Sequence, residues 1–558
     1  MKTKIILYIL AGILVLFVAG IIILHLVLPG KVAGSIQKEV KEMLEGEAAG
    51  LYQVDIPEVK FSPLFRTMYI TSVLLVPDTQ ALASREPEAL PPEIFNIRTG
   101  AMEVSTRALI ALARNKDEIV FSNFQLEDLS ALIIRNPAGK EPEKNGDSPA
   151  LRSVEIKNFS IAFTSLKVQM LEALGSDVFS LDQGRFSGGF HWQPDEGPTT
   201  GTDADPDEHT DNMKFDLRDP EFAAAKLNIM LPDGLHRIAC DSLALGQGGA
   251  RLKLFEAEMI PLFSKRQFRN QITHQTDRME ISVDTVQFTG FDLNQLINHN
   301  YLSVEKLELN QGRLEVFRDR HPPFNTSQRP TMPVRLIVQA PFQMWLGTIE
   351  VNDLDLFYQE LPEGSAEEGV IPFRNLSATL SNITNAEDHL LQDSLMRIEA
   401  TARMFGRPRL TAFFVYNLRD INGGYRARGT LAAMPFETIN PAIFPLTGMR
   451  VLEGTHEQTT FSFTGNDFRS DGELTMRYSG LELDLAPERS QLRQRITNWA
   501  GRQFVYHSSN PAANGEIRPG TIDFEREIDR FVFHYWWNSF LTGAGSTVMR
   551  GGSNSNSD

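Results

Sequence analysis

The chain has 558 residues, of which 42% are apolar and 22% charged, so it can bury a large core and is not disordered overall. Its formal net charge is −17 and it has no Lys/Arg-rich tract, which argues against a nucleic-acid partner. The single cysteine, Cys240, excludes an intramolecular disulfide and a cysteine-based zinc or iron–sulfur site within one chain. The 36 Phe, against 10 Tyr and 5 Trp, would suit an apolar lining or an ordinary core equally.

The first informative stretch is residues 5–28, which contain no Asp, Glu, Lys or Arg. A helix of this length extends about 36 Å, enough to cross the roughly 30 Å hydrocarbon core of a bilayer. A cleaved signal peptide is the alternative, but its apolar region is usually only about 7–15 residues long. We therefore predict an uncleaved N-terminal transmembrane helix within residues 1–30. The Lys and Arg residues on its two flanks do not separate the two orientations, whereas the short leading tail favours a cytoplasmic N-terminus.

A stripe of apolar residues predicts a linking helix over residues 31–51, and from there onward alternation with period two dominates. Three segments predict two strands around a turn, because Gly, Asn and Asp tolerate the positive φ that tight turns need. These predicted hairpins are residues 307–316, 349–358 and 474–485. Short helices are expected at residues 109–114, 166–174 and 293–299 and near the C-terminus.

A weak internal repeat supports an extended β structure. Residues 102–135 and 286–317 each show a strand, a helical turn and three strands at nearly the same spacing. One such unit cannot cover its own apolar face, so repeated units are expected to stack along an axis. The fold class we predict is mainly β: an elongated, twisted β-groove of repeated strands and hairpins with a few short helices.

No candidate motif for catalysis, for a metal or for a cofactor is complete in this sequence. Residues 203–214 have the first acidic positions of an EF-hand loop, but Glu208 replaces its glycine and Lys214 its bidentate glutamate. Residues 246–249 resemble a phosphate-binding loop without the third glycine or the lysine. We therefore predict a protein that is not an enzyme and that has no metal site and no cofactor. A hydrolase acting at the membrane is a minor alternative.

One predicted hairpin carries an entirely apolar face. It consists of Leu474, Met476, Tyr478, Leu481, Leu483 and Leu485. Such a face either packs against a second layer as a closed core or stays open as a groove for an apolar ligand. From the residues alone both interpretations remain open.

The C-terminal half resembles the AsmA-like family of bacterial envelope proteins. The resemblance rests on the order and the residue patterns of several segments, which are 342–358, 371–383, 410–418, 424–431 and 472–485, followed by the aromatic segment 531–541. His534 and the pair Trp536 and Trp537 depart from the pattern expected at that end. The single N-terminal anchor also fits the family.

The resemblance implies a groove that stands off the inner membrane, lets phospholipids cross the periplasm and so supports outer-membrane biogenesis. Anchorage would be through residues 5–28, as a single-pass inner-membrane protein with the bulk of the chain in the periplasm. The partners would be membrane phospholipids and outer-membrane components. The predicted lipid-groove residues are the six apolar residues of 474–485. The alternative is an anchored scaffold or assembly factor that captures strands of outer-membrane proteins at its sheet edges.

The expected organisation has six segments. They are the anchor (1–30), the linking helix (31–51), the N-terminal part of the β-groove with its repeats (52–335), an AsmA-like C-terminal β region (336–490), a helical and aromatic cap (491–550) and a disordered tail (551–558).

The segment Glu525–Phe540 has apolar and aromatic residues at helical spacing. A helix of this kind can cap the end of the β structure. Trp and Tyr also favour membrane interfaces, so Trp536 and Trp537 are alternatively candidates for contact with the distal membrane or a protein in it.

Overall fold

The computed structural model describes residues 50–62, 66–105, 118–139, 153–194, 213–325, 332–485, 506–527 and 532–549. Within these ranges the protein is mainly β, with 60% of residues in strands and 16% in helices, and the strands form a large mixed sheet with few, short helices. This confirms the predicted fold class at that level. The predicted anchor, the tail and all but the last two residues of the linking helix lie outside the described residues. No helix inside the described ranges is long and apolar enough to span a bilayer.

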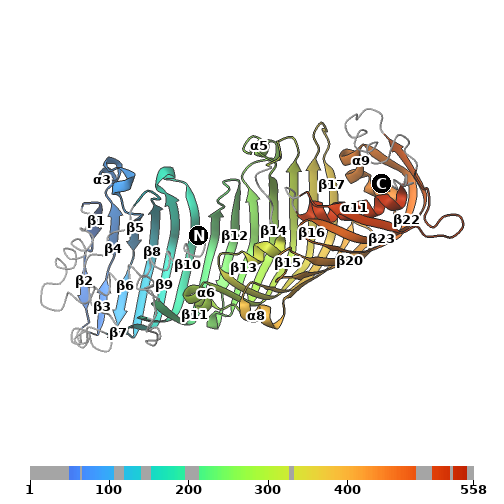
Figure 1. Cartoon of the computed structure of the whole chain (residues 1–558). Helices are drawn as coiled ribbons and strands as arrows, with labels where there is room; N and C mark the ends of the chain where they lie inside the picture. Colours follow the sequence, from blue (N-terminus) through green and yellow to red (C-terminus); the bar gives the residue numbers. More distant parts are fainter. Residues whose placement is uncertain are drawn as a thin grey trace, which may run out of the picture. The chain divides into compact units, whose positions relative to one another are not determined.

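The chain divides into two compact units, whose strands and helices are labelled in Figure 1. The first comprises the residues up to Glu256 together with Phe288–Ser303, and the second comprises Ala257–Gln287 together with the chain from Val304 onward. The boundaries cut three strands, which are β13 (Arg251–Pro261), β14 (Asp277–Thr289) and β15 (Tyr301–Asp319).

The first unit is a strongly bulged sheet. Its strands are β1 (Tyr52–Asp55), β2 (Val59–Phe61), β3 (Thr67–Ile70), β4 (Val73–Pro77), β5 (Glu93–Thr99), β6 (Met102–Ser105), β7 (Glu118–Phe121), β8 (Asn123–Arg135), β9 (Ser153–Met170), β10 (Asp177–Pro194), β11 (Met213–Met230) and β12 (His236–Leu245). β7 and β8 both run parallel to β9, and the other printed pairings of this unit are antiparallel. The two halves of β8 pair with different strands, β6 and then β5, so the sheet branches at the positive-φ residue Asp128.

A cluster of phenylalanines forms the centre of the core of this unit. Phe159 and Phe186 meet edge to face at 4.9 Å, and Phe222 lies 6.0 Å from both Phe163 and Phe186. Register partners across β9 to β11 place these rings on one face, where Phe159, Phe163 and Phe186 are buried with leucines and isoleucines and Phe222 is half-buried against them.

Helix α6 (Leu293–His299) closes part of an edge of this sheet. β12 pairs only with the second half of β11, and α6 follows the first half. The Asn298 side chain accepts a hydrogen bond from the Phe215 N–H and donates one to its carbonyl, and Asn294 does the same at Leu217. Two carboxamides four residues apart thus replace a neighbouring strand. Other short helices of this unit are α3 (Thr79–Ser84), η1 (Pro87–Ala89), η2 (Leu171–Ala173) and η3 (Gln247–Gly249).

The second unit is an antiparallel meander with helices at its strand ends and on one face. Its strands are β16 (Gln343–Leu361), β17 (Gly369–Thr384), β18 (Leu395–Met404), β19 (Arg409–Asn417), β20 (Tyr425–Leu431), β21 (Met434–Pro435), β22 (Met449–Gly465), β23 (Arg469–Leu485) and β24 (Gly520–Glu525). Each pairs with the next, except that β20 and β21 both pair with β22. The helices are α5 (Lys265–Arg269), α7 (Pro333–Val338), α8 (Glu387–Gln392), η4 (Phe436–Ile439), α9 (Asn440–Thr447) and α11 (Val532–Val548).

The three predicted hairpins are wrong, because each is one continuous strand. Residues 307–316 lie within β15, 349–358 within β16 and 474–485 within β23. The residues assigned to turns do adopt positive φ, at Gln311, Asp353 and Gly480. In β16 and β23 the ladder shifts register near these residues, so the same local conformation makes a β-bulge instead of a chain reversal. The strands of the second repeat copy, residues 302–317, are likewise a single strand.

The helix predictions fare differently. The helix over Leu293–His299 is confirmed as α6. The helix over residues 166–174 is wrong, because β9 continues to Met170 and only η2 follows. The C-terminal helix is confirmed over residues 532–540, but Glu525 ends β24 and α11 continues to Val548. The predicted helix over residues 109–114 lies outside the described residues.

Candidate functional site

The second unit has one apolar sheet face. Register partners on neighbouring strands point to the same side of a sheet, so the printed pairings define rows across it. One row is Ile349, Leu380, Ile398, Phe414, Ala427 and Phe463, and the next is Val351, Ala378, Ala400, Ala412, Gly429, Phe461 and Leu474. Both rows are apolar throughout, and the second is built mainly from small residues over β17 to β20.

The opposite face is polar. The row that alternates with these two is Glu350, Thr379, Glu399, Phe413, Arg428, Ser462 and Glu473. Its one aromatic side chain, Phe413, lies under the Arg428 guanidinium at 5.2 Å. The alternation of apolar and polar residues in the sequence therefore corresponds to one apolar and one polar sheet face in this unit.

Helix α11 covers one part of the apolar face (Figure 1). It packs on β23 and β24, where a Cβ added at Gly543 would overlap Leu474 and Ile522, and one added at Gly520 would overlap the Gly543 carbonyl. Ser539 and Ser470 join helix and sheet by a buried hydroxyl–hydroxyl bond of 2.7 Å. Small residues therefore allow the close approach. Under the helix Leu474 and Ile522 are fully buried, whereas the row residues of β16 to β19 are half-buried.

An apolar cavity of about 530 Å³ lies beside this helix. Large parts of its walls come from β22 and β23, from α9 and from α11. Cavities of roughly 300–1,000 Å³ are the size range in which proteins hold small-molecule ligands. The lining is overwhelmingly aliphatic and aromatic, with a few polar groups at fixed places.

The residues predicted for an apolar groove divide into three groups. Met476, Leu481 and Leu483 line the cavity. Leu474 lies on the same face but under α11, and Tyr478 is covered by the segment after residue 505, with its hydroxyl donating to the His507 carbonyl at 3.0 Å. Leu485 ends β23, and its side chain lies outside the described side chains. The bulge at Gly480 keeps the even-numbered residues before it and the odd-numbered residues after it on one face.

The two tryptophans of α11 occupy different environments. Trp536 packs on Phe414 of the apolar face, with 4.8 Å between ring centroids. Trp537 lines the cavity and stacks on Phe540 at 5.9 Å. Both are half-buried within the protein, which is where a capping helix places its aromatic residues.

Helix α9 is the part of the cavity wall that sequence reasoning missed. Asn440 holds its first turn by bonding both the N–H and the carbonyl of Val451, each at 2.8 Å. At the other end Leu446 lies so close to Gly369 of β17 that a Cβ there would overlap it. Pro441 just inside the helix start and Gly448 just past its end are the signals that could have located this helix.

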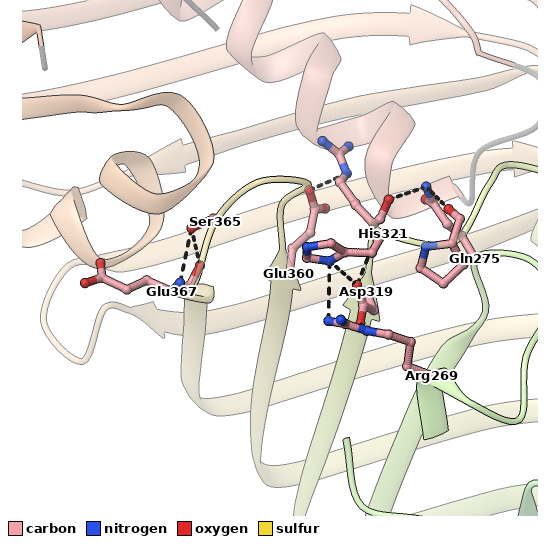
Figure 2. A network of polar contacts seen from close by, with 9 residues as sticks. Arg269, Gln275, Asp319, His321, Glu360, Ser365 and Glu367 are labelled. Atoms are coloured by element: carbon pink, nitrogen blue, oxygen red, sulfur yellow. Dashed lines mark hydrogen bonds and ion pairs between the residues drawn. The ribbon is translucent and has the colours of Figure 1, made fainter. Parts of the chain in front are cut away.

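One end of the cavity is charged, and Figure 2 shows the polar contacts around Asp319 and Glu360 at that end. Arg320, Tyr358 and Glu360 lie on its wall, where the Arg320 Nε lies 2.6 Å from a Glu360 oxygen and the Tyr358 hydroxyl donates to the other oxygen at 2.9 Å. Behind them Asp319 accepts from the His321 ring at 2.7 Å and from Arg269. Burial works against ionisation of Asp319, but these hydrogen bonds outweigh it and hold its pKa below the usual range. The charges at this end are compensated by one another.

A hydroxyl–imidazole pair lies in the wall. The Thr459 hydroxyl and His456 Nε2 are 2.7 Å apart, and both side chains are fully buried. Burial lowers the pKa of His456, so the ring is neutral at pH 7. Acyl transfer also needs preorganised donors for an oxyanion. The backbone of Thr459 is paired with Leu431 on one side and Met476 on the other, so its N–H belongs to the sheet ladder. The Thr459 hydroxyl here serves as the hydrogen-bond partner of the buried His456 ring.

Among the described residues, no group of three or more His, Cys, Asp or Glu side chains converges in a way that could hold a metal ion. What the arrangement can do is remove a long apolar group from water and place a polar group against Arg320, Tyr358 and Glu360. No protein-family model and no curated protein matches this chain. The resemblance to AsmA-like proteins stays a prediction from the sequence.

Proposed function

We propose that the protein is a non-enzymatic carrier that shields phospholipid acyl chains on the apolar face of its sheet. The observation that carries the proposal is the cavity of about 530 Å³, which is aliphatic along most of its wall and charged at one end. A phospholipid has the same division into an apolar and a charged part. Exposing the roughly 30 methylenes of two acyl chains to water costs on the order of 20 kcal/mol, so a shielding surface removes most of the barrier to transfer.

The resemblance supplies the setting of the proposal. In this account the protein is anchored in the bacterial inner membrane through residues 5–28, and its β structure forms a groove in the periplasm that supports the outer membrane. The half-buried apolar rows over β16 to β19 support a groove that continues beyond the cavity. Transfer along such a face requires no nucleotide hydrolysis. This agrees with residues 246–249, which resemble a phosphate-binding loop but lack its third glycine and its lysine.

The alternative scaffold function depends on free strand edges. Two described edges are already bonded to helices: the first half of β11 to Asn294 and Asn298, and β24 to Ser546, whose hydroxyl accepts from the Thr521 N–H at 2.8 Å and donates to its carbonyl at 3.2 Å. These edges are not available to the strand of a client protein, which favours the carrier function.

A photo-crosslinking amino acid on β23 tests the proposal. In the full-length membrane-inserted chain, the probe at Leu483 lies on the cavity wall, whereas the probe at the adjacent Glu482 lies on the exposed opposite face. We expect irradiation to attach phospholipid at position 483 and not at position 482. Crosslinks from position 483 to outer-membrane proteins without any lipid would select the scaffold function instead.

A further inference from the structure

The most exposed large apolar side chains of the described residues share one rim of the second unit. They are Leu336, Leu391, Ile421 and Phe468, with exposed fractions of 59%, 68%, 78% and 59%. Single exposed apolar side chains are ordinary. These four are not scattered, however, since each belongs to a different connection between strands, and we call them the apolar rim.

The topology places the four connections at the same end of the strands. α7 leads into β16, α8 joins β17 to β18, residues 418–424 join β19 to β20, and residues 466–468 join β22 to β23. Because these strands are antiparallel neighbours, every second connection lies at one end, opposite to the end that carries α9. At about 4.8 Å per strand, the rim extends roughly 20–30 Å.

Hydrogen bonds and ion pairs fix the connections to one another. Arg335 of α7 bonds both the Ile421 carbonyl and the Asp467 carboxylate, and Asp467 in turn receives an ion pair from the buried Arg526. The Asp467 N–H donates to the Asn422 carbonyl at 2.8 Å. The exposed side chains therefore project from connections that these contacts hold to one another.

Ion pairs also hold α8 in place, and they neutralise four charged side chains near the rim. Arg419 pairs with Glu387 of α8, and Arg397 pairs with Asp393 at 2.8 Å. The apolar side chains that protrude are three aliphatic residues and one phenylalanine, and they stand among exposed polar side chains such as Glu387 and Arg419, which are paired with each other. Protein interfaces derive most of their energy from Trp, Tyr and Arg, with Leu under-represented. An edge that exposes Leu, Ile and Phe beside ion-paired charges is suited to an uncharged, apolar surface.

We propose that the apolar rim inserts into the interface of a zwitterionic lipid bilayer and holds the second unit against it. All four side chains come from the same strand ends, which is the arrangement that contact with one membrane surface requires. This goes beyond lipid carriage, since the rim lies at the strand ends opposite α9 and the contact does not depend on what fills the cavity.

Depth-dependent fluorescence quenching tests the proposal on the full-length chain in phosphatidylcholine vesicles. An environment-sensitive fluorophore is attached to Ile421→Cys or Phe468→Cys, and the matched control is Arg407→Cys, an exposed residue in the connection at the other strand end. The native Cys240 is buried, so labelling is directed to the introduced thiol. Vesicles with a nitroxide on the acyl chains should quench positions 421 and 468 at least twofold more than position 407.

Equal quenching at all three positions, or none at 421 and 468, overturns the proposal; the second result is also the one expected of a rim that binds a protein. A second variant pair, Leu336→Asp with Leu391→Asp, should reduce quenching of the label at 421 at least twofold while thermal unfolding stays unchanged. Undiminished quenching in that folded variant also contradicts insertion by the rim as a whole.

Discussion

The burial of His456 affects both the protonation of its ring and the stability of the fold. The His456 side chain is 1% exposed in the wall of an apolar cavity, its Nε2 is bonded to Thr459, and burial lowers its pKa. The folded chain therefore resists protonation of this ring, whereas the unfolded chain titrates at its ordinary value of about 6.5. The neutral ring keeps a charge out of the part of the cavity that holds Met476 and Leu481.

This difference predicts a pH-dependent stability. Because the folded pKa lies below the unfolded pKa, the stability that His456 supplies is complete above about pH 6.5 and is lost as the pH falls toward the folded pKa. We expect the unfolding temperature of the wild type to fall more between pH 7.5 and pH 5.0 than that of His456→Gln. Equal losses in the two proteins, measured by thermal unfolding in the same buffers, would contradict the burial of this imidazole.

The positive-φ residues show what a sequence can and cannot tell at this scale. Asp353 and Gly480 lie inside the segments predicted to turn, and both adopt the positive φ that tight turns need. Whether the chain then reverses or continues depends on the neighbouring strand, since β17 and β22 offer unbroken partners on both sides of the bulge. That partner is far away in the sequence, so local residues alone predicted a hairpin.

At the scale of elements, α11 joins the predicted cap to the predicted apolar face. The position of α11 could not be predicted from the alternation of residues. Gly520, Gly543 and Ser470 allow the close contact between helix and sheet, but nothing in the local sequence shows that the two elements meet there. The apolar face itself was predictable, since its residues alternate along each strand. α9 was missed because its eight residues are too few for a clear helical period, although its flanking Pro441 and Gly448 mark its ends.

The two tryptophans of α11 can be separated by substitution. Trp536→Ser removes the ring that packs on Phe414, and we expect it to lower the free energy of unfolding by about 2–3 kcal/mol, somewhat less than the 3–5 kcal/mol of a fully buried tryptophan. Trp537→Ser, on the cavity wall, should cost less stability and alter lipid retention instead. Denaturant unfolding of the full-length chain measures the first effect. Intact folding of Trp536→Ser with lost outer-membrane function would show a distal contact site in place of a cap.

The carboxamides of α6 protect an edge strand, and this too can be tested. Replacing both Asn294 and Asn298 with Ala leaves the N–H and carbonyl groups of Phe215 and Leu217 without the partners shown here. We expect a loss of about 1–3 kcal/mol in stability and a greater tendency to associate through the exposed edge. Light scattering during heating measures the association, and Gln295→Ala on the same helix is the control. A double variant as monomeric as the control would show that the edge needs no protection.

At the scale of the whole molecule, the decisive feature is the apolar face of the second unit, which α11 covers at one side and which is half-buried over β16 to β19. The alternation of apolar and polar residues made the sheet and its two faces predictable from the sequence. The cavity could not be predicted in the same way, since its wall combines β16, β22, β23 and two helices, and its charged end brings Glu360 of β16 together with Arg320, which follows β15.

The most direct test of the central claim is the amount of phospholipid that the purified full-length protein retains. Leu483→Trp fills the cavity from β23, and Glu482→Trp adds the same ring to the exposed face one residue away. After gentle detergent extraction and removal of free lipid, mass spectrometry should find phospholipid on the wild type and on Glu482→Trp, and at least threefold less on Leu483→Trp. Equal retention by the two variants, or no phospholipid on the wild type, would contradict a cavity that holds acyl chains.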